Sequence, residues 1–338
     1  MRVGLDVSPL RLTKAGTARV IQNLQEIGGG AGAGATAGAA GAPVEIVPLD
    51  WPGAGRAAAA VRDALWYPHL LPRQARRARV DVLHCPSFRG PVAAPMPMVV
   101  TVHDLAVLRH PELFNRWTRE ISRRYVPRVV EAARLVVAVS AFTRDELGEV
   151  LGTPAEKVRV VPNAVPAGFS PDGPRAEGDY VLAVGTLEPR KNLVRLAEAA
   201  AIAGVELRVV GARGWGDVEL PAHVRLAGPV DDEELAALYR GARCLAYPSL
   251  YEGFGIPIVE AMACGTPVVT SAGGATEEVA GGAAVLVDPF DPAAIAAGIA
   301  EAATRAPELR AAGLERARAF TRERVVEAML DVYREAAA

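Results

Sequence analysis

The sequence of 338 residues is poor in cysteine, lysine and aromatic residues, with three cysteines, three lysines and 5% aromatics. Cys85, Cys244 and Cys264 lie far apart, so both a disulfide framework and zinc-ligand spacing are missing. No run of about 18 apolar residues occurs, and the N-terminal segment lacks the apolar stretch of a secretory signal. These absences predict reduced thiols, no transmembrane helix and a cytoplasmic location.

Several motifs of common enzyme classes are also missing. There is no G-x-G-x-x-G, no G-x-x-x-x-G-K-[ST] and no G-x-S-x-G. The first absence argues against a nicotinamide enzyme. No D-x-D at a strand end, no H-E-x-x-H and no cluster of Cys and His occurs either, so the sequence predicts no metal site.

Charge is distributed unevenly along the chain, although the total is only −2. Residues 1–165 carry a net charge of +7 and residues 166–338 a net charge of −9. Such an asymmetry indicates different partners for the two halves. Lysine is so rare beside arginine that most arginines reflect composition, whereas Lys191 stands out as a residue with a specific role.

Short apolar strands alternate with helical segments through both halves of the chain, which is typical of parallel sheets with crossover helices. The expected strands are 2–7, 44–49, 81–85, 98–104, 135–140 and 158–163, then 180–185, 205–211, 224–228, 244–249, 267–271 and 283–287. Ser140 is expected to cap a helix, and Pro127 should kink or split the helix expected over 111–133.

The pattern therefore predicts an α/β protein with two Rossmann-like, doubly wound domains whose ligand-binding edges face an interdomain cleft. The expected divisions are an N-terminal acceptor-side domain over 1–165, a Pro- and Gly-rich linker over 166–178, a nucleotide-sugar-binding domain over 179–320, and a C-terminal helix over 321–338 that packs back toward the N-terminal domain. The Gly/Ala stretch 28–42 reads as a surface loop without chemistry.

The segment 247–269 carries two acids, Glu252 and Glu260, around a Gly-Phe-Gly turn at 253–255. Pro257 favours a helix start there, so the turn would present backbone N–H groups at a helix N-terminus, which bind anions. Eight residues span up to about 12 Å along a helix, too far for a tight acid–base pair. The two acids therefore either flank a diphosphate or belong to an ordinary strand–turn–helix.

Arg190 and Lys191 follow a strand that ends at Gly185 and Thr186, and they precede Asn192, which is expected to cap the next helix. Two cations at the mouth of a cleft suit a diphosphate, because charge-assisted hydrogen bonds to phosphate are strong. A solvated basic turn is the alternative interpretation.

His103 and Asp104 lie just past another buried strand. A histidine at a strand's carboxyl end can donate a hydrogen bond to a substrate hydroxyl or phosphate, or it can simply pack. Gly16 and Thr17 open the first helix and form a weaker candidate for a phosphate contact.

Together these segments resemble the family-four retaining glycosyltransferases of the GT-B fold, over nearly the whole chain. The resemblance rests on the E-x7-E pattern of EGFGIPIVE, which spans Glu252 and Glu260, and on EAMACGTPVV after it. GTLEPRKNL, SAFTRDEL, VPNAV and TVHDL also resemble family segments and occur in the expected order. The N-terminal loop AGTARVI departs from the fuller glycine pattern of relatives, which weakens the acceptor-side predictions.

The resemblance implies a hexosyltransferase that moves a sugar, with retention, from a nucleotide diphosphate sugar to a glycan or lipid-linked acceptor, without metal or other cofactor. It implies that Glu252 contacts the donor sugar, that Glu260 binds the ribose, and that Arg190 and Lys191 clamp the diphosphate. His103 would lie near the transferring centre. The other donor-binding residues implied are Gly16, Gly185, Val230, Gly253, Phe254, Gly255 and Ile256. Similarity to bacterial polysaccharide mannosyltransferases points to a mannosyl donor with guanosine.

Two other classes stay open on the sequence alone. One is a sugar-nucleotide epimerase-like enzyme, and the other is a catalytically silent nucleotide-sugar-binding subunit. The presence of both glutamates, the cation pair and His103 argues against a silent subunit.

Two basic segments in the N-terminal half suggest a further partner. They comprise Arg73, Arg76, Arg77 and Arg79, next to Trp66, Tyr67, Leu70 and Leu71, and then Arg116, Arg119, Arg123, Arg124 and Arg128. Arginines beside apolar residues suit peripheral contact with an anionic inner membrane face, and a solvated surface is the alternative. No nucleic-acid motif accompanies the charge, so nucleic acid is not expected as a partner.

Overall fold

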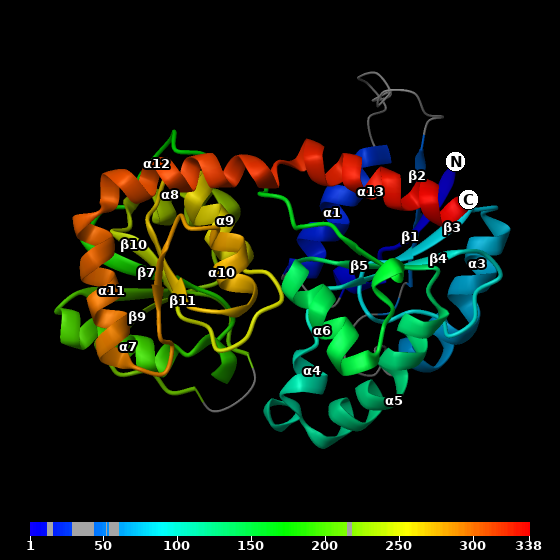
Figure 1. Ribbon diagram of the computed structural model, residues 1–338, viewed down its shortest axis with the longest axis horizontal. Helices are drawn as coiled ribbons and strands as arrows, with labels where there is room; N and C mark the ends of the chain where they lie inside the picture. Colours follow the sequence, from blue (N-terminus) through cyan, green and yellow to red (C-terminus); the bar gives the residue numbers. More distant parts are fainter. Residues whose placement is uncertain (12–15, 29–43, 52, 54–60, 215–217) are drawn as a thin grey trace. The chain divides into compact units, whose positions relative to one another are not determined.

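The computed structural model describes residues 1–11, 16–28, 44–51, 53, 61–214 and 218–338 (Figure 1). The chain forms two compact units, one of Met1–Ala164 with Arg322–Ala338 and the other of Val165–Thr321. We call them unit 1 and unit 2. The segment expected as a linker belongs to unit 2, where the buried Arg240 donates hydrogen bonds to its carbonyl oxygens. Apart from Gly28, the Gly/Ala stretch 28–42 lies outside the described residues.

Unit 1 is built on a six-stranded parallel sheet with the order β2-β1-β3-β4-β5-β6. The strands are β1 (Arg2–Asp6), β2 (Glu45–Leu49), β3 (Val82–Cys85), β4 (Met98–Val102), β5 (Leu135–Ala138) and β6 (Val158–Val160). Strands β3, β4 and β5 are buried throughout, as expected for parallel strands covered on both faces.

Helices cover both faces of the unit 1 sheet. One face packs against α1 (Gly16–Gly28) and α13 (Arg322–Ala337). The other packs against the π-helical η2 (Arg62–Leu70), α3 (Leu71–Arg77), α5 (Arg116–Ala132) and α6 (Ala141–Leu151). The short elements are η1 (Ser8–Arg11), α4 (Ala106–Arg109), η3 (Pro111–Leu113) and η4 (Ala155–Lys157).

A buried polar network ties α13 to the unit 1 sheet. His84 on β3 lies 2.8 Å from the Tyr333 hydroxyl of α13 and 2.8 Å from the Thr101 hydroxyl of β4. Burial lowers the pKa of His84 to about 3, so the ring is neutral near pH 7. The last helix of the chain is thus held by hydrogen bonds as well as by apolar packing.

Unit 2 is built on a second six-stranded parallel sheet, with the order β12-β11-β10-β7-β8-β9. Its strands are β7 (Tyr180–Val184), β8 (Glu206–Val210), β9 (Arg225–Gly228), β10 (Cys244–Tyr247), β11 (Val268–Ser271) and β12 (Val285–Val287). On one face, α7 (Leu193–Ala203) and α11 (Pro292–Thr304) pack against the sheet. The remaining elements are η5 (Pro189–Lys191), α8 (Asp232–Gly241), α9 (Ile256–Ala263), α10 (Gly274–Ala280), α12 (Ala306–Ala317) and η6 (Arg318–Phe320).

Each unit is therefore a Rossmann-like, doubly wound domain, and the strand–helix alternation of the sequence predicted this correctly. In unit 1 the strand order reverses between β1 and β3, and in unit 2 between β7 and β10. The carboxyl ends of the strands at such a reversal are where ligands bind in open α/β sheets. A ligand site is therefore expected at the carboxyl ends of β1 and β3 in unit 1 and of β7 and β10 in unit 2.

One local expectation differs from the structure, one segment was not anticipated, and one expectation is confirmed. Pro127 does not split its helix, because α5 runs through it and is held by the buried Val126, Val129 and Val130. The sequence pattern gave no sign of η2 and α3, which hold the buried Trp66, Tyr67 and Leu71. The cap at Ser140 is confirmed, since its hydroxyl accepts a hydrogen bond from the Thr143 amide at 2.9 Å.

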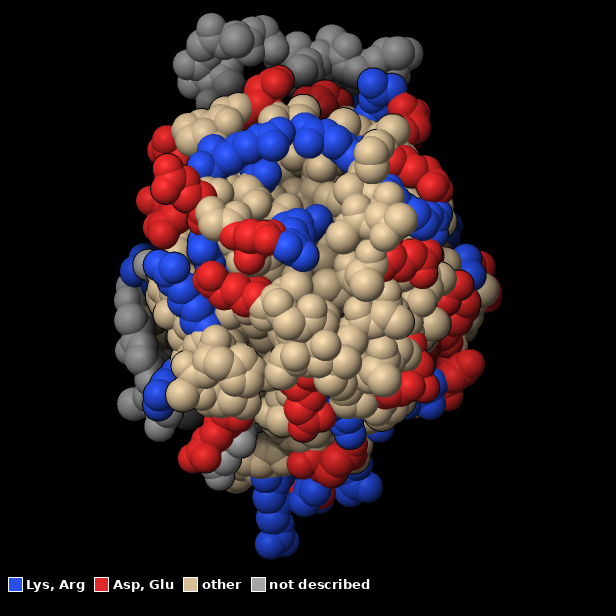
Figure 2. Space-filling model, turned by 90° about the vertical axis from the view of Figure 1, so that its left-hand side faces the viewer, with Lys and Arg blue, Asp and Glu red and all other residues tan. Residues whose placement is uncertain are grey.

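No described helix is both long and apolar enough to cross a membrane. The face that carries α7 and α11 mixes acidic and basic side chains (Figure 2). This mixed face belongs to the half of the sequence with net charge −9.

Candidate functional site

The predicted cation pair lies at the strand reversal of unit 2. Strand β7 ends at Val184, and Gly185 follows with a φ of 152°. A Cβ at this position would lie 3.1 Å from Lys191 Cε, so glycine allows the lysine side chain to lie across the end of β7. Strand β10 ends next to it at Tyr247, and the loop 248–255 leads from there into α9.

Arg190, Lys191 and Glu252 form one hydrogen-bonded cluster with Tyr247 and Glu188. Arg190 donates to Glu252 Oε2 at 2.7 Å, and Lys191 Nζ donates to Glu252 Oε1 at 2.6 Å. Lys191 Nζ also lies 2.6 Å from the Tyr247 hydroxyl, which donates to Glu252 Oε1 at 2.9 Å. Arg190 pairs with Glu188 at 2.7 Å. These residues are separated in the sequence, and the fold brings them together.

Backbone contacts fix the two loops that carry this cluster. The Leu250 amide donates to the Arg190 carbonyl at 2.8 Å, which ties the 248–255 loop to η5. Asn192 takes a left-handed conformation, with φ 59°, and its side chain does not cap α7 as expected. Its amide instead donates to the carbonyls of Pro248 and Pro289, at 3.0 and 2.6 Å. Asn192 therefore holds the loops of the site together and does not cap α7.

The electrostatics of the cluster favour an anionic Glu252 between two cations. Burial alone would raise the pKa of Glu252, but the charges of Arg190 and Lys191 outweigh it and lower the pKa to about 2. Burial also lowers the pKa of Lys191, against the attraction of Glu252. The side chains of Lys191 and Glu252 are 10% and 9% exposed, so this pairing is screened little by solvent. Two cations and two anions leave the cluster with no net charge.

Glu260 lies apart from the cluster, in the middle of the eight-residue helix α9. It is buried and accepts a hydrogen bond from the Tyr239 hydroxyl of α8 at 2.9 Å. The helix that carries it begins after Gly255, whose φ of 106° favours glycine. Phe254 is buried and packs edge-on against Phe320, with ring centroids 5.6 Å apart.

Val230 follows the end of β9 and is half-buried, directly before Asp231, which caps α8. Gly253 is buried and Ile256 begins α9 as a half-buried residue. The structure thus distributes the predicted donor-binding residues of unit 2 over the carboxyl ends of β7, β9 and β10.

The unit 1 candidates lie at the carboxyl edge of the other sheet. His103 follows β4, and its Nε2–H donates to the Pro86 carbonyl, past the end of β3, at 2.9 Å. Burial lowers the pKa of His103, so near pH 7 the ring is neutral, with Nδ1 as its acceptor atom. Asp104 Oδ1 accepts a hydrogen bond from the amide of Ala106, the first residue of α4, at 3.0 Å. Gly16 begins α1, and residues 12–15 before it lie outside the described part.

Sequence reasoning missed Tyr247 and Glu188. Tyr247, at the end of a buried strand, is typical of a core residue in the sequence. In the structure its hydroxyl bridges Lys191 and Glu252, and the Lys191 ammonium lies 4.8 Å from the Tyr247 ring centroid. The only available signal was its place at the end of a strand next to the reversal.

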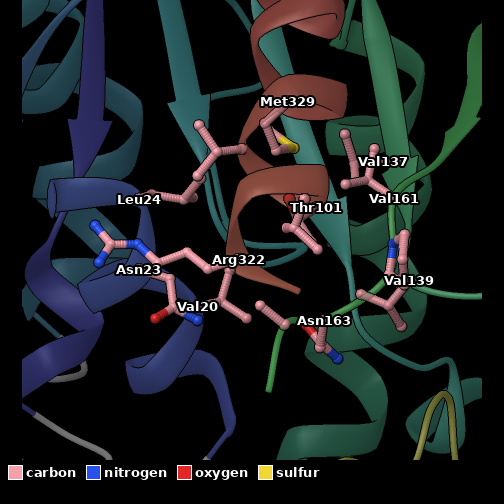
Figure 3. A pocket seen from close by; sticks show the side chains of 14 residues that line it. Val20, Asn23, Leu24, Thr101, Val137, Val139, Val161, Asn163, Arg322 and Met329 are labelled. Carbon is pink, nitrogen blue, oxygen red and sulfur yellow. The ribbon is translucent and has the colours of Figure 1, made fainter. Parts of the chain in front are cut away.

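Unit 1 also contains a small apolar cavity between α1, α13 and the ends of β5 and β6 (Figure 3). Its volume is about 30 Å³, enough for one or two water molecules and too small for a sugar ring. The labelled lining residues are Val20, Asn23, Leu24, Thr101, Val137, Val139, Val161, Asn163, Arg322 and Met329. In the described part of the chain, no group of three or more His, Cys, Asp or Glu side chains is placed to hold a metal ion.

Two family models match consecutive parts of the chain. Residues 35–169 match the model described as Glycosyltransferase Family 4, and residues 169–320 match Glycosyl transferases group 1. The O-antigen chain mannosyltransferase B of Escherichia coli is 34% identical over 244 residues, 64% of each chain. A D-inositol 3-phosphate glycosyltransferase of Salinispora tropica is 34% identical over 72% of this chain and 60% of its own length. The chain thus spans less than two thirds of these relatives.

Solved structures match over nearly the full length. Sucrose-phosphate synthase from Thermosynechococcus elongatus has a TM-score of 0.76 at 19% identity and covers 99% of this chain, with 98% of its own chain matched. HepE from Anabaena, solved with UDP and glucose, has a TM-score of 0.71 at 18% identity, with coverage of 99% and 100%. At these identities the likeness establishes the fold.

Proposed function

This chain belongs to the family-four glycosyltransferases with the GT-B fold, and from this premise we propose that it transfers a sugar from a nucleoside diphosphate sugar to an acceptor hydroxyl with retention at the anomeric carbon. The observation that carries the proposal is the convergence of Arg190, Lys191 and Glu252 at the strand reversal of unit 2.

The cation pair supplies the diphosphate site. Arg190 and Lys191 already point at an anion, which is the Glu252 carboxylate. A diphosphate is the stronger ligand for a guanidinium and an ammonium, because it offers more charge and more acceptor oxygens. Binding of the donor therefore replaces the Glu252 contacts, and the released carboxylate accepts hydrogen bonds from the sugar hydroxyls. The exchange keeps each buried charge paired at every stage.

Glu260 is proposed to bind the ribose. The support is its place in the E-x7-E pattern, and Tyr239 fixes the orientation of its carboxylate through a hydrogen bond. A Glu260→Gln variant keeps the volume and should weaken nucleoside diphosphate binding about tenfold, the loss of one charge-assisted hydrogen bond. A Tyr239→Phe variant should give a smaller loss of the same kind.

We propose that the acceptor attacks on the face from which the diphosphate leaves, through an oxocarbenium-like state. In this proposal the Glu252 carboxylate released by the donor accepts hydrogen bonds from the sugar hydroxyls, so it does not serve as the covalent nucleophile. Arg190 and Lys191 stabilise the charge that develops on the leaving diphosphate, and that diphosphate accepts the proton of the acceptor hydroxyl.

Mannose is the proposed sugar, with guanosine as the base, and a glycan or lipid-linked hydroxyl as the acceptor. The support is the likeness to the O-antigen chain mannosyltransferase B of E. coli. Because of the likeness to D-inositol 3-phosphate glycosyltransferases, a polyol should be tested as an acceptor as well.

Metal independence is part of the same proposal, because the cation pair takes the role of a divalent ion at the diphosphate. The experiment is release of nucleoside diphosphate from a panel of GDP-, UDP- and ADP-sugars, with acceptor candidates, in excess EDTA. Turnover should be unchanged by the chelator. Turnover abolished by EDTA and restored by Mg²⁺ or Mn²⁺ would refute the role assigned to Arg190 and Lys191.

We also propose a peripheral membrane contact through α5 of unit 1. Trp117 is 75% exposed, and Ile121 is exposed one turn further along the same side. Arg116, Arg123, Arg124 and Arg128 are exposed on the same helix. The other predicted segment fits less well, because Trp66, Tyr67 and Leu71 are buried and do not contact lipid.

A further inference from the structure

The two oxygens of the Glu252 carboxylate are held by different donors. Oε2 accepts a hydrogen bond from Arg190 at 2.7 Å, whereas Oε1 accepts from Lys191 Nζ at 2.6 Å and from the Tyr247 hydroxyl at 2.9 Å. Two donors from separate elements, η5 and β10, thus converge on the position of one anionic oxygen. Any anion that replaces the carboxylate at this position meets both donors.

The Tyr247 side chain is held in place from several sides. It is buried at the end of β10, which lies between β7 and β11 in the sheet. The Tyr247 carbonyl accepts a hydrogen bond from the Thr270 hydroxyl of β11 at 3.0 Å. The Tyr247 hydroxyl accepts from Lys191 Nζ at 2.6 Å, and the ammonium lies 4.8 Å from the ring centroid. The ring therefore keeps its position when a loop side chain such as Glu252 moves.

The Tyr247 hydroxyl keeps its proton and remains a hydrogen-bond donor. Burial and the charge of Glu252 raise the pKa of Tyr247 well above its ordinary value, and this effect exceeds the lowering by Arg190 and Ser249. A phenol carries one hydrogen to donate, and an ammonium offers only hydrogens. The phenol hydrogen is therefore directed to the acceptor Glu252 Oε1 and not to Lys191.

The exchange proposed for the donor substrate removes the acceptor of this hydrogen. When Glu252 turns to the sugar, Lys191 and Tyr247 lose the same oxygen. A buried hydroxyl without an acceptor is unfavourable, so the incoming group has to supply one. An oxygen of the diphosphate satisfies both donors at once, because it carries negative charge for the ammonium and accepts more than one hydrogen bond.

We propose that Tyr247 is a third donor of the diphosphate site. Its hydroxyl donates to the same diphosphate oxygen as Lys191, at the position that Glu252 Oε1 occupies in this structure. The inference rests on the proposed function and adds to it a donor outside the cation pair. A phenol donates without adding charge, so it stabilises the leaving diphosphate while the charge of the cluster is unchanged.

The test compares two tyrosines of the unit 2 sheet, each of which loses only its hydroxyl. Tyr247→Phe removes the proposed donor, and Tyr180→Phe is the matched control. Tyr180 is also buried on a strand of this sheet, its hydroxyl donates to the Leu238 carbonyl at 2.7 Å, and the Arg208 guanidinium lies 3.8 Å from its ring centroid. The probes are GDP and UDP, titrated by calorimetry, and guanosine and uridine, titrated by NMR, all with the full chain.

The diphosphate that binds the wild type better should bind Tyr247→Phe about tenfold more weakly, the loss of one hydrogen bond to a charged group. Its nucleoside should bind both proteins equally, and Tyr180→Phe should match the wild type for both ligands. A purely structural role of Tyr247 would weaken diphosphate and nucleoside alike. That result, or an unchanged diphosphate affinity in Tyr247→Phe, would overturn the proposal.

Lys191→Ala, titrated with the same probes, separates this inference from the proposed function. Weaker diphosphate binding in Lys191→Ala with unchanged binding in Tyr247→Phe would refute only the role of Tyr247. Unchanged binding in both variants, or no diphosphate binding to the wild type, would refute the diphosphate site itself.

A second measurement keeps the hydroxyl and so does not depend on the folding of Tyr247→Phe. With 3-fluorotyrosine inserted at position 247, the ¹⁹F resonance should shift when the diphosphate is added and stay in place when the nucleoside is added. The same resonance position with and without the diphosphate would contradict the contact.

Discussion

Both sheets carry polar side chains at the strand reversal, and the two sets differ in how they are paired. In unit 2, Arg190 and Lys191 pair with Glu188 and Glu252 in a cluster without net charge. In unit 1, the buried Asp6 has no cation paired with it in the described part of the chain and accepts hydrogen bonds from the Ser8 amide and Trp66 Nε1, and His103 is neutral near pH 7. In the proposed function, the unit 2 edge exchanges an internal anion, Glu252, for the diphosphate of the donor.

The comparison shows how two copies of one architecture can carry different chemistry. The sheet reversal supplies the place in both cases, and the residues that end the first strand of each sheet supply the chemistry. Gly185 after β7 admits a lysine side chain, whereas Asp6 ends β1 with a carboxylate. Function therefore follows from the side chains at the reversal rather than from the fold.

The largest effect is expected where the unit 2 cluster loses a cation. Lys191→Ala or Arg190→Ala should lower kcat/KM about 10²- to 10³-fold, the scale of losing one preorganised donor at a developing charge. Arg225→Ala is the matched control, because it removes an exposed arginine from β9 of the same unit. Steady-state kinetics with the best donor of the panel would check this, and an effect no larger than that of Arg225→Ala would break the comparison.

A change at the unit 1 edge should separate catalysis from donor binding. His103→Ala should lower kcat about 10²-fold, the lower end for a lost acid–base or polar contact. Nucleoside diphosphate affinity should stay nearly constant, because the residues assigned to the diphosphate lie in unit 2. A weaker nucleoside diphosphate affinity with an unchanged kcat would contradict this role and would mean that His103 contributes to donor binding.

The buried titrating groups of unit 1 should give opposing pH dependences of stability. The folded pKa of His84 is about 3, below its ordinary value, so the unfolded chain takes up a proton first and stability falls as pH drops from about 6.5 toward 3. Burial raises the folded pKa of Asp6 to about 6, so its contribution is full at low pH and is lost as pH rises from about 4 to 6.

An Asp6→Asn variant removes the contribution of Asp6 to the pH dependence of the unfolding free energy and leaves that of His84. Between pH 4 and 6 its unfolding free energy should fall with decreasing pH more steeply than that of the wild type, by about 1.4 kcal/mol per pH unit at most. Urea unfolding at several pH values measures both slopes. Parallel slopes for the two proteins would mean that Asp6 is ionised throughout this range.

The smallest effect is expected at the membrane. The full chain should co-sediment with vesicles of anionic lipid at low salt, and less at high salt, because each cation near such a surface contributes about 1 kcal/mol. Trp117→Ala should reduce this binding severalfold, and Leu226→Ala, at an exposed position of unit 2, should not. Equal and negligible binding to anionic and neutral vesicles would leave α5 as an ordinary solvated helix.

The strands follow from the sequence, because buried parallel strands read as short apolar runs. The sequence also pointed to Arg190, Lys191 and Glu252 as residues of the proposed donor site. The role of Asn192 was predicted wrongly. An asparagine directly before a helix favours a helix cap, but its side chain donates instead to the carbonyls of Pro248 and Pro289, which are distant in the sequence. The contacts of Tyr247 with Glu252 and of Trp66 with Asp6 were missed. The second contact joins distant segments, and Trp66 and Tyr67 lie on a π-helix whose periodicity a 3.6-residue pattern does not detect.

The most direct test of the account is calorimetric titration of nucleoside diphosphates into the wild type, Lys191→Ala and Glu252→Gln, in excess EDTA. If the diphosphate replaces Glu252 at the cation pair, Lys191→Ala should bind at least tenfold more weakly, and Glu252→Gln should bind more tightly than the wild type while its turnover falls. Thermal unfolding of each variant checks that the fold is kept, because an unpaired buried charge destabilises. Glu252→Gln binding as weakly as Lys191→Ala would contradict the exchange, since the carboxylate would then support the diphosphate instead of competing with it.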